Sequence, residues 1–222
     1  MEFRLLYAGE LHASSASNPR VGEKHAIRKA LHPQLKRLWE THRGLIELAA
    51  HHCGAVQYQR PSTPEEIALE SQFVAPFGAT EWHRRLGLRY FAKNWERCGC
   101  GFIPLITETI AVRCAIDILF LRPEEPGRIL QSGDLDNRIK TLFDGLRIPA
   151  NLDECGAVPP SGEFDPMYCL LEDDQLISEV RVVTDKLLML PKTNVISKHD
   201  VFLVLHVKLE PLSGSQWEHI YR

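Results

Sequence analysis

Several features that mark specialised classes of protein are missing from this chain of 222 residues. No apolar run approaches the roughly 20 residues that a membrane-spanning helix requires. The N-terminus, Met-Glu-Phe-Arg-Leu-Leu-Tyr, lacks the basic and apolar segments of a signal peptide. Internal repeats, low-complexity tracts and a clean domain boundary are also missing. These absences predict a single-domain cytoplasmic protein without a membrane partner.

Closely spaced cysteine pairs are a further absence. The six cysteines are scattered along the chain: Cys53, Cys98, Cys100, Cys114, Cys155 and Cys169. None has the Cys-x-x-Cys spacing of a typical zinc site, so zinc held by His51-His52-Cys53 and Cys98-Gly-Cys100 is the weaker alternative. In a cytoplasmic protein of this size we expect free thiols.

A strong positive charge is missing as well, since the net charge is −3. The distribution of charge is uneven. Between Arg20 and Arg43 there are seven Lys and Arg residues and two Glu, whereas between Asp134 and Asp185 there are twelve acids and four bases. A basic arm and an acidic pocket suit an enzyme that holds phosphates at one place and metal ions at another. A solvated basic helix face is the alternative. The candidate nucleic-acid-binding residues are Lys24, Arg28, Lys29, Lys36 and Arg37.

The acidic region contains the most informative stretch, Gly133-Asp-Leu-Asp-Asn-Arg-Ile-Lys-Thr-Leu-Phe-Asp-Gly-Leu146. Its apolar residues have the i, i+3, i+4, i+7 spacing of an amphipathic helix that starts at Asn137. These residues are Ile139, Leu142, Phe143 and Leu146. Asp136, Lys140 and Asp144 recur at i, i+4 and i+8, so they share a different face of the same helix.

Two carboxylates stand just before this predicted helix. In an extended lead-in, Asp134 and Asp136 point the same way and can converge on one point. Two ionised carboxylates that close repel each other unless a cation lies between them, and Mg²⁺ prefers such oxygen ligands. The Asp173-Asp174 pair would close the site from a neighbouring loop or strand end. Lys140 would face a phosphate or a nucleophilic water. Acidic residues that hold a metal ion beside a lysine are typical of enzymes that hydrolyse phosphodiester bonds.

A plainer interpretation stays open for each of these residues. Asp134 or Asp136 could cap the helix, where aspartate contributes about 1 kcal/mol. Lys140 and Asp144 could form a solvated i, i+4 pair that contributes a few tenths of a kcal/mol. Spacing alone does not decide between these roles and a metal site.

The pattern Asp134-Leu-Asp-Asn-x-x-Lys-x-x-x-Asp144, followed by Asp173-Asp174 and a predicted strand, resembles the RusA family of Holliday-junction resolvases. The similarity covers about Gly133 to Thr184, with seven polar positions in matching order. It implies catalytic roles for Asp134, Asp136 and Asp174, which would bind Mg²⁺, and for Lys140, which would be the essential basic residue. It gives supporting positions to Asn137, Asp144 and Asp173.

The resemblance also implies a fold and an activity. The expected fold is α+β and RusA-like, a mixed β-sheet with helices packed mainly on one face. Residues 1–222 would form a single RusA-like domain with an N-terminal helical elaboration at about 20–100 and an inserted loop at about 147–171. The implied protein is a homodimer that uses Mg²⁺ or Mn²⁺ to hydrolyse phosphodiester bonds in branched DNA such as Holliday junctions.

Two other function classes stay open. The first is a non-cleaving nucleic-acid-binding or regulatory protein on the same fold, in which the inserted loop covers the site. The second is a metal-dependent hydrolase of another phosphate substrate, such as a nucleotide. Strong binding of nucleic acid without cleavage indicates the first, and release of phosphate from free nucleotides indicates the second.

The remaining elements are predicted from local patterns. Helices are expected at Glu23–Leu31 and, after an interruption or a new start at Pro33, from Pro33 to about Ala50. The segment Asn151–Pro166 is predicted to be a surface loop. Strands are expected at Phe3–Tyr7, Phe102–Ile106, Ile110–Leu121, Ile177–Thr184 and Val201–Leu209, with the second and third forming a hairpin. Asp117 lies in the third of these strands, where we expect a salt bridge or exposure at a strand edge rather than an approach to the metal site.

Overall fold

The computed structural model describes residues 1–13, 20–52, 63–64, 67–68, 81–123, 134–155, 164, 166–189 and 197–212. Its larger sheet contains β1 (Glu2–Glu10), β7 (Asp200–Pro211), β4 (Val112–Arg122) and β6 (Ile177–Lys186), in that order. β7 is antiparallel to both of its neighbours, and β6 is parallel to β4. The smaller sheet has the order β2 (Glu96–Arg97), β3 (Cys100–Ile106) and β5 (Met167–Leu171), with β3 and β5 parallel.

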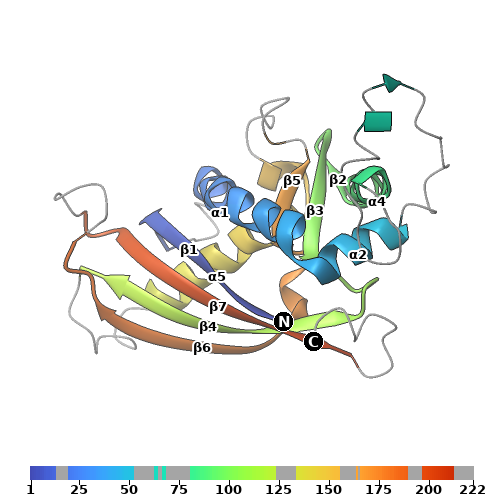
Figure 1. Cartoon of the computed structure of the whole chain (residues 1–222). Helices are drawn as coiled ribbons and strands as arrows, with labels where there is room; N and C mark the ends of the chain where they lie inside the picture. Colours follow the sequence, from blue (N-terminus) through green and yellow to red (C-terminus); the bar gives the residue numbers. More distant parts are fainter. Residues whose placement is uncertain are drawn as a thin grey trace.

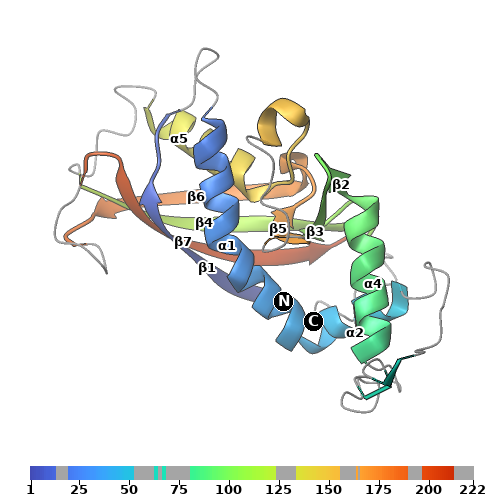
Figure 2. The same cartoon turned by 90° about the horizontal axis from the view of Figure 1, so that it is seen from above.

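The helices form a second layer. α1 (Val21–Thr41) crosses over the larger sheet, and α5 (Asp134–Leu146) lies over the same face (Figure 1 and Figure 2). α2 (Arg43–His51) packs against α4 (Glu81–Asn94), which also packs against β3. Two short 3-10 helices, η3 (Leu152–Cys155) and η4 (Asp174–Leu176), precede β5 and β6. This arrangement confirms the predicted α+β class, with two mixed sheets in place of one.

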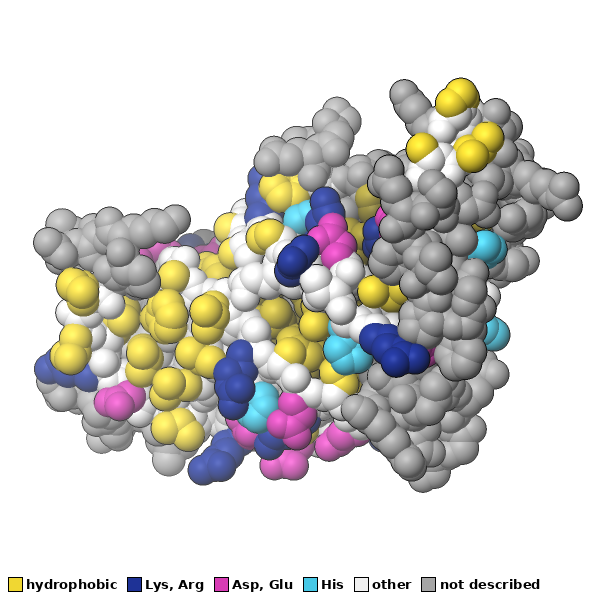
Figure 3. Space-filling view, viewed as in Figure 1, with side chains coloured by type: hydrophobic (Ala, Val, Ile, Leu, Met, Phe, Trp, Pro, Cys, Tyr) yellow, Lys and Arg dark blue, Asp and Glu magenta, His cyan; other side chains and the backbone are white. Residues whose placement is uncertain are grey.

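Alternating residues divide the larger sheet into a buried and an exposed face. Along β7, Leu203, Leu205 and Val207 are fully buried, and the residues between them are partly exposed. On the opposite face Leu6 and Val183 are each 48% exposed. Figure 3 shows hydrophobic side chains gathered at the left of the view, over the larger sheet. The core therefore lies between this sheet and the layer that contains α1 and α5.

β4 is an inner strand of the larger sheet, as its mostly apolar sequence predicts. It is hydrogen-bonded to β6 on one side and to β7 on the other. Asp117 leaves this strand on the solvated face and forms an ion pair with Lys208, with 2.9 Å between the carboxylate oxygen and Nζ. The expectation of a salt bridge at Asp117 is confirmed.

The predicted hairpin at residues 102–121 is wrong. β3 and β4 are consecutive in the chain but belong to different sheets. The turn between them contains Ala111 at a φ of 55°, and the backbone N–H of Ile110 donates to Thr107 Oγ1 at 3.1 Å. The chain thereby leaves the smaller sheet and enters the larger one. Each strand pairs with segments far away in sequence, so local alternation could not identify its partner.

The predicted break at Pro33 is also wrong, because α1 continues through this residue. Proline in a helix interior costs about 3 kcal/mol. Leu31 and Leu35 on either side of it are fully buried, and such packing supplies most of the stability of helices in proteins. The helix ends at Thr41, where His42 adopts an extended conformation with φ −80° and ψ 119°. The stretch predicted as one helix to Ala50 is thus divided between α1 and α2.

The range predicted as an inserted loop, about 147–171, includes regular structure. η3 lies near its beginning, and β5 forms its end. All five residues of β5 are buried, and the strand pairs with β3. The prediction of a loop is therefore wrong at residues 167–171. β5 is an apolar segment too short to show a clear period, although its residues are typical of a buried parallel strand.

Two cysteines form a disulfide, which corrects the expectation of free thiols. Cys98 lies in the turn between β2 and β3, where it and Gly99 have φ values of 57° and 72°, the left-handed pair typical of a two-residue hairpin turn. Its sulfur is bonded to that of Cys155 in η3, with the Cα atoms 6.4 Å apart. Cys100, Cys114 and Cys169 are free and buried, whereas Cys53 lies outside the described residues. The bond removes Cys98 from the alternative zinc site.

α2 and α4 approach so closely that one contact admits only glycine. A Cβ atom on Gly87 would overlap the backbone carbonyl oxygen of Ala49. We expect Gly87→Ala to lower the free energy of unfolding by about 1–3 kcal/mol, because a backbone oxygen cannot yield as a flexible side chain does. Urea unfolding measures the effect. Gly22→Ala is the control, since nothing lies within 4 Å of the added atom, and it should be neutral or stabilising. An equal loss of stability in Gly87→Ala and Gly22→Ala would show that the contact with Ala49 does not require glycine at position 87.

Candidate functional site

α5 presents the acidic and basic residues that the sequence singled out. The helix starts at Asp134 rather than at Asn137, and the side chain of Asp134 lies outside the described residues. Asp136 and Lys140 are both exposed and stand one turn apart on the same side of the helix. Positions 134 and 136 of a helix are about 200° apart, so the predicted convergence in an extended lead-in does not apply. The sequence pattern thus predicted that Asp136 and Lys140 share a side of a helix, but not the helical conformation at Asp134.

Asp144 occupies a different environment from the other acids of α5. It is buried, and its carboxylate lies 2.7 Å from Lys24 Nζ and 3.1 Å from Arg147 Nη2. Arg147 also donates to the carboxylate of Glu154 at 2.9 Å. Asp144 therefore joins α1 to the C-terminal end of α5 through a buried ion-pair network.

Arg28 is buried at the same contact between α1 and α5. Its guanidinium donates to the backbone carbonyls of Asp144 at 2.6 Å and Arg147 at 2.9 Å. These carbonyls end α5, where a cation also complements the helix dipole. Arg28 is 1% exposed and Lys24 is 5% exposed. Both residues thus stabilise the contact between α1 and α5, and neither faces a nucleic acid in this structure.

The three remaining residues of the predicted basic arm lie farther along α1 and are more accessible. Lys29 is half-buried, with Nζ 5.4 Å from the centre of the Phe164 ring. Lys36 is exposed. Arg37 is exposed and lies 3.8 Å from Glu40. The prediction of a basic surface on this helix is therefore reduced to these three residues, because Lys24 and Arg28 are turned toward α5.

Asp173 and Asp174 lie at the start of η4, which packs against α5. Asp173 caps η4 by accepting a hydrogen bond from the backbone N–H of Gln175 at 2.9 Å. Burial, together with the carboxylates of Asp173 and Asp144, raises the pKa of Asp174 above its ordinary value, although Arg147 opposes the shift. A raised carboxyl pKa lowers the stability of the folded state as the pH increases through the shifted range. The structure therefore brings Asp174 together with Asp173 and Asp144.

A small cavity of about 370 Å³ lies beside these acids. Arg147 and Glu172 line it, and neither was singled out from the sequence. Arg147 follows Asp144 by three residues, which is the spacing of a helical ion pair and the one local signal that could have identified it. The lining residues are Arg97, Glu108, Arg147, Ile148, Pro149, Ala150, Glu172, Asp173 and Gln175.

The predicted metal ligands are not all brought together by the part of the chain that is described. Asp136 precedes Asp144 by eight residues, or about 12 Å along the helix axis. Within the described ranges no group of three His, Cys, Asp or Glu side chains could hold a metal ion. The side chain of Asp134, a predicted ligand, lies outside the described part of the chain. The acids form two subsets, one with Asp136 on the exposed face of α5 and one with Asp174 at η4.

The chain was also compared with known proteins. None of its described helices is long and apolar enough to cross a membrane. Neither a protein-family model, nor a curated protein, nor a solved structure matches the chain. Its function is therefore inferred from its own residues and their arrangement.

Proposed function

We propose that this chain is a RusA-like endonuclease that hydrolyses phosphodiester bonds in branched DNA such as Holliday junctions. The observation that carries the proposal is the exposed face of α5, where Asp136 and Lys140 stand one turn apart. Asp173 and Asp174 add a second pair of carboxylates at η4, which packs against the same helix. Acids next to a lysine on an accessible surface suit chemistry on a phosphate group.

The donor atoms at this surface fit Mg²⁺ or Mn²⁺. Both ions prefer oxygen ligands, and the side chains of Asp173 and Asp174 lie within hydrogen-bond reach of each other. By the resemblance, Asp134, Asp136 and Asp174 would hold the metal, which requires the two subsets of acids to approach each other when the ion binds. When bound, such an ion lowers the pKa of a coordinated water and offsets charge on a phosphate. The described residues supply the acidic surroundings in which that chemistry would take place.

The remaining roles in binding the phosphate and supporting the site belong to other residues of the chain. Lys140, exposed on α5, would hold the scissile phosphate by its charge. Asp173 keeps η4 in place through its cap, and Asp144 fixes α5 to α1. Asn137 follows Asp136 on α5, and its backbone carbonyl accepts a hydrogen bond from Thr141 Oγ1 at 3.0 Å. We propose a homodimer as well, because paired sites would allow symmetric cuts across a junction.

Incision of a labelled four-way junction tests this function. With Mg²⁺ or Mn²⁺ the protein should give paired symmetric nicks, and EDTA should abolish them. Linear duplex and single strand serve as controls for structure specificity. Binding of the junction without any incision, under every metal condition, would contradict the endonuclease and indicate a regulatory binding protein. Release of phosphate from free nucleotides, with the junction intact, would indicate a different hydrolase.

A further inference from the structure

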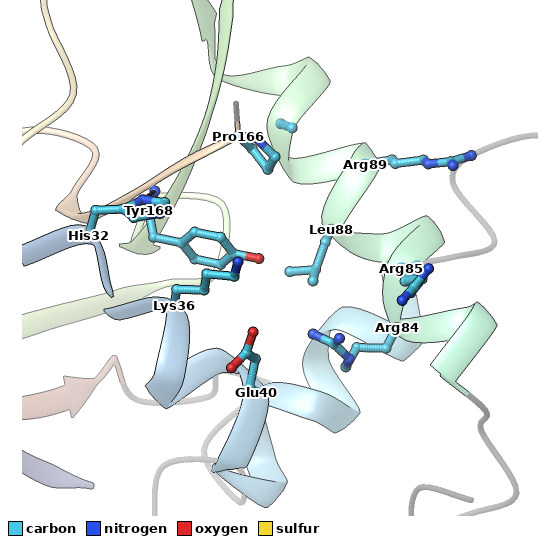
Figure 4. Close-up of a pocket in the computed structure, with 10 residues that line it drawn as sticks. His32, Lys36, Glu40, Arg84, Arg85, Leu88, Arg89, Pro166 and Tyr168 are labelled. Carbon is cyan, nitrogen blue, oxygen red and sulfur yellow. Dashed lines mark hydrogen bonds between the residues drawn. The ribbon is translucent and has the colours of Figure 1, made fainter. Parts of the chain in front are cut away.

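A second cavity lies between α1, α4 and the start of β5, with a volume of about 650 Å³. Figure 4 shows that the side chains of Lys36, Glu40, Arg84, Leu88 and Tyr168 extend toward its centre from both helices and from β5. A volume of this size is in the usual range for small-ligand sites. The lining residues are His32, Lys36, Glu40, Arg84, Arg85, Leu88, Arg89, Ala92, Pro166 and Tyr168.

The cavity carries an excess of positive charge. Its lining contains four Lys and Arg residues and one acid, Glu40. Glu40 lies 3.8 Å from Arg37, which reduces its effect on the cavity. Glu81, one turn before the arginines of α4, accepts from Arg84 Nε at 2.6 Å and from Arg85 Nε at 3.1 Å. Arg84 and Arg85 are thereby held at the cavity wall. The four cations of the lining still outnumber Glu40 and Glu81, so the cavity retains a net positive charge.

Neutral hydrogen-bond donors complete the lining. The backbone N–H of Tyr168 donates to His32 Nδ1 at 3.0 Å, which fixes this histidine on the wall. Burial raises the pKa of the Tyr168 hydroxyl to about 12, with a contribution from Glu40 and Glu81 that Arg84 opposes. The hydroxyl is therefore protonated at neutral pH and able to donate. Leu88, Ala92 and Pro166 provide apolar surface beside it.

From these observations we propose that the cavity between α1 and α4 binds a phosphate-bearing ligand of nucleotide size. Lys36 and Arg84, which extend toward the centre of the cavity (Figure 4), supply the charge for the phosphate, and Arg85 and Arg89 add positive charge at its wall. The Tyr168 ring and Leu88 form the apolar wall against which a flat base would lie. The ligand is either a free nucleotide or a nucleotide unit of a nucleic-acid strand, and both share the chemistry of a phosphate attached to a base.

This site is separate from the acids of α5. Lys24, at one end of α1, contacts Asp144, whereas Lys36 lies twelve residues later, or about 18 Å along the helix. The cavity therefore goes beyond the proposed function, and its binding requires neither the metal nor cleavage.

Binding of thymidine 5′-monophosphate, thymidine and a short oligothymidylate in EDTA tests the cavity. The double variant Lys36→Gln/Arg85→Gln removes two exposed charges from the lining. The matched control, Lys93→Gln/Arg113→Gln, removes the same charges from exposed positions outside it. We expect the nucleotide to bind the wild type more tightly than thymidine does. We also expect the lining variant to weaken nucleotide binding about tenfold or more, with little change in the control.

The ratio of the dissociation constants of thymidine 5′-monophosphate and the oligothymidylate shows whether the ligand is a free nucleotide or a nucleic-acid strand. Tighter binding of the oligothymidylate, with a salt dependence that falls by about 1.4 in log–log slope in the lining variant, supports a strand. Equal binding of both supports a free nucleotide. Thymidine bound as tightly as the nucleotide, no nucleotide binding, or equal effects of the two double variants would overturn the proposal. Asp136→Asn should retain nucleotide binding. The test of the cavity therefore stays valid if the chain does not cleave DNA.

Discussion

Asp136→Asn should reduce incision of a four-way junction more than about 100-fold while junction binding and folding remain intact. Asp136 is exposed on α5, so the amide replaces it without a packing change. Removing a residue behind a metal ligand typically costs 10–100-fold in affinity or activity, so loss of a proposed ligand should cost at least as much. Single-turnover incision and gel-shift binding, measured with the same junction, separate chemistry from recognition.

The control for this experiment is Asp185→Asn. Asp185 is an equally exposed aspartate at the far end of β6 from η4. This substitution changes the net charge by the same amount, so it should leave incision unchanged. Incision by Asp136→Asn at the wild-type rate would refute the role of this carboxylate. Loss of junction binding in Asp136→Asn would instead show that the residue serves recognition.

Asp144→Asn should lower the free energy of unfolding by about 3–5 kcal/mol. The carboxylate is buried between Lys24 and Arg147, at 2.7 and 3.1 Å. Removing one partner of a buried ion pair leaves the other charge uncompensated, which costs more than the pair contributes. Urea unfolding followed by tryptophan fluorescence measures the loss. Asp136→Asn, on the exposed side of the same helix, should change stability by less than about 0.5 kcal/mol.

A second substitution separates the burial of charge from other effects at this position. Lys24→Met removes the uncompensated amine, so the double variant Lys24→Met/Asp144→Asn should recover part of the stability that Asp144→Asn loses. A loss in Asp144→Asn below about 1 kcal/mol would show that water reaches the carboxylate and that the network is not a structural support. Junction incision by the double variant, measured at a temperature where it is folded, tests whether Asp144 has any role beyond positioning α5.

The sequence was most informative where the structure depends on local periodicity. α5, β1 and β7 lie close to where their apolar patterns predict, because each pattern reports which face of an element is buried. β6 also forms where a strand was predicted, although none of its residues is buried. It was least informative where the outcome depends on a distant partner. β3 and β4 follow each other but pair with β5 and β7, and no local signal distinguishes that arrangement from a hairpin.

The same distinction applies to the candidate residues. Asp136 and Lys140 are exposed on one side of α5, which their spacing predicts. Lys24 and Arg28 have the composition of a DNA-binding surface, yet they are buried against residues more than 100 positions away. The basic cavity combines α1 with α4 and β5, so its cations are separated by long stretches of chain. Charge composition identifies the cations, but only tertiary packing decides which of them reach solvent.

The order of strands in the larger sheet has a consequence for folding during synthesis on the ribosome. β1 pairs with β7 over its whole length, and about 190 residues separate Glu10 from its partner Asp200. At about 5–20 residues per second, β1 is synthesised roughly 10–40 s before the strand that it requires. The edge that β7 covers is open to other chains during this interval, and such non-local pairing is slow to form. The larger sheet should therefore be completed only after the last strand, which joins β1 to β4, has left the exit tunnel.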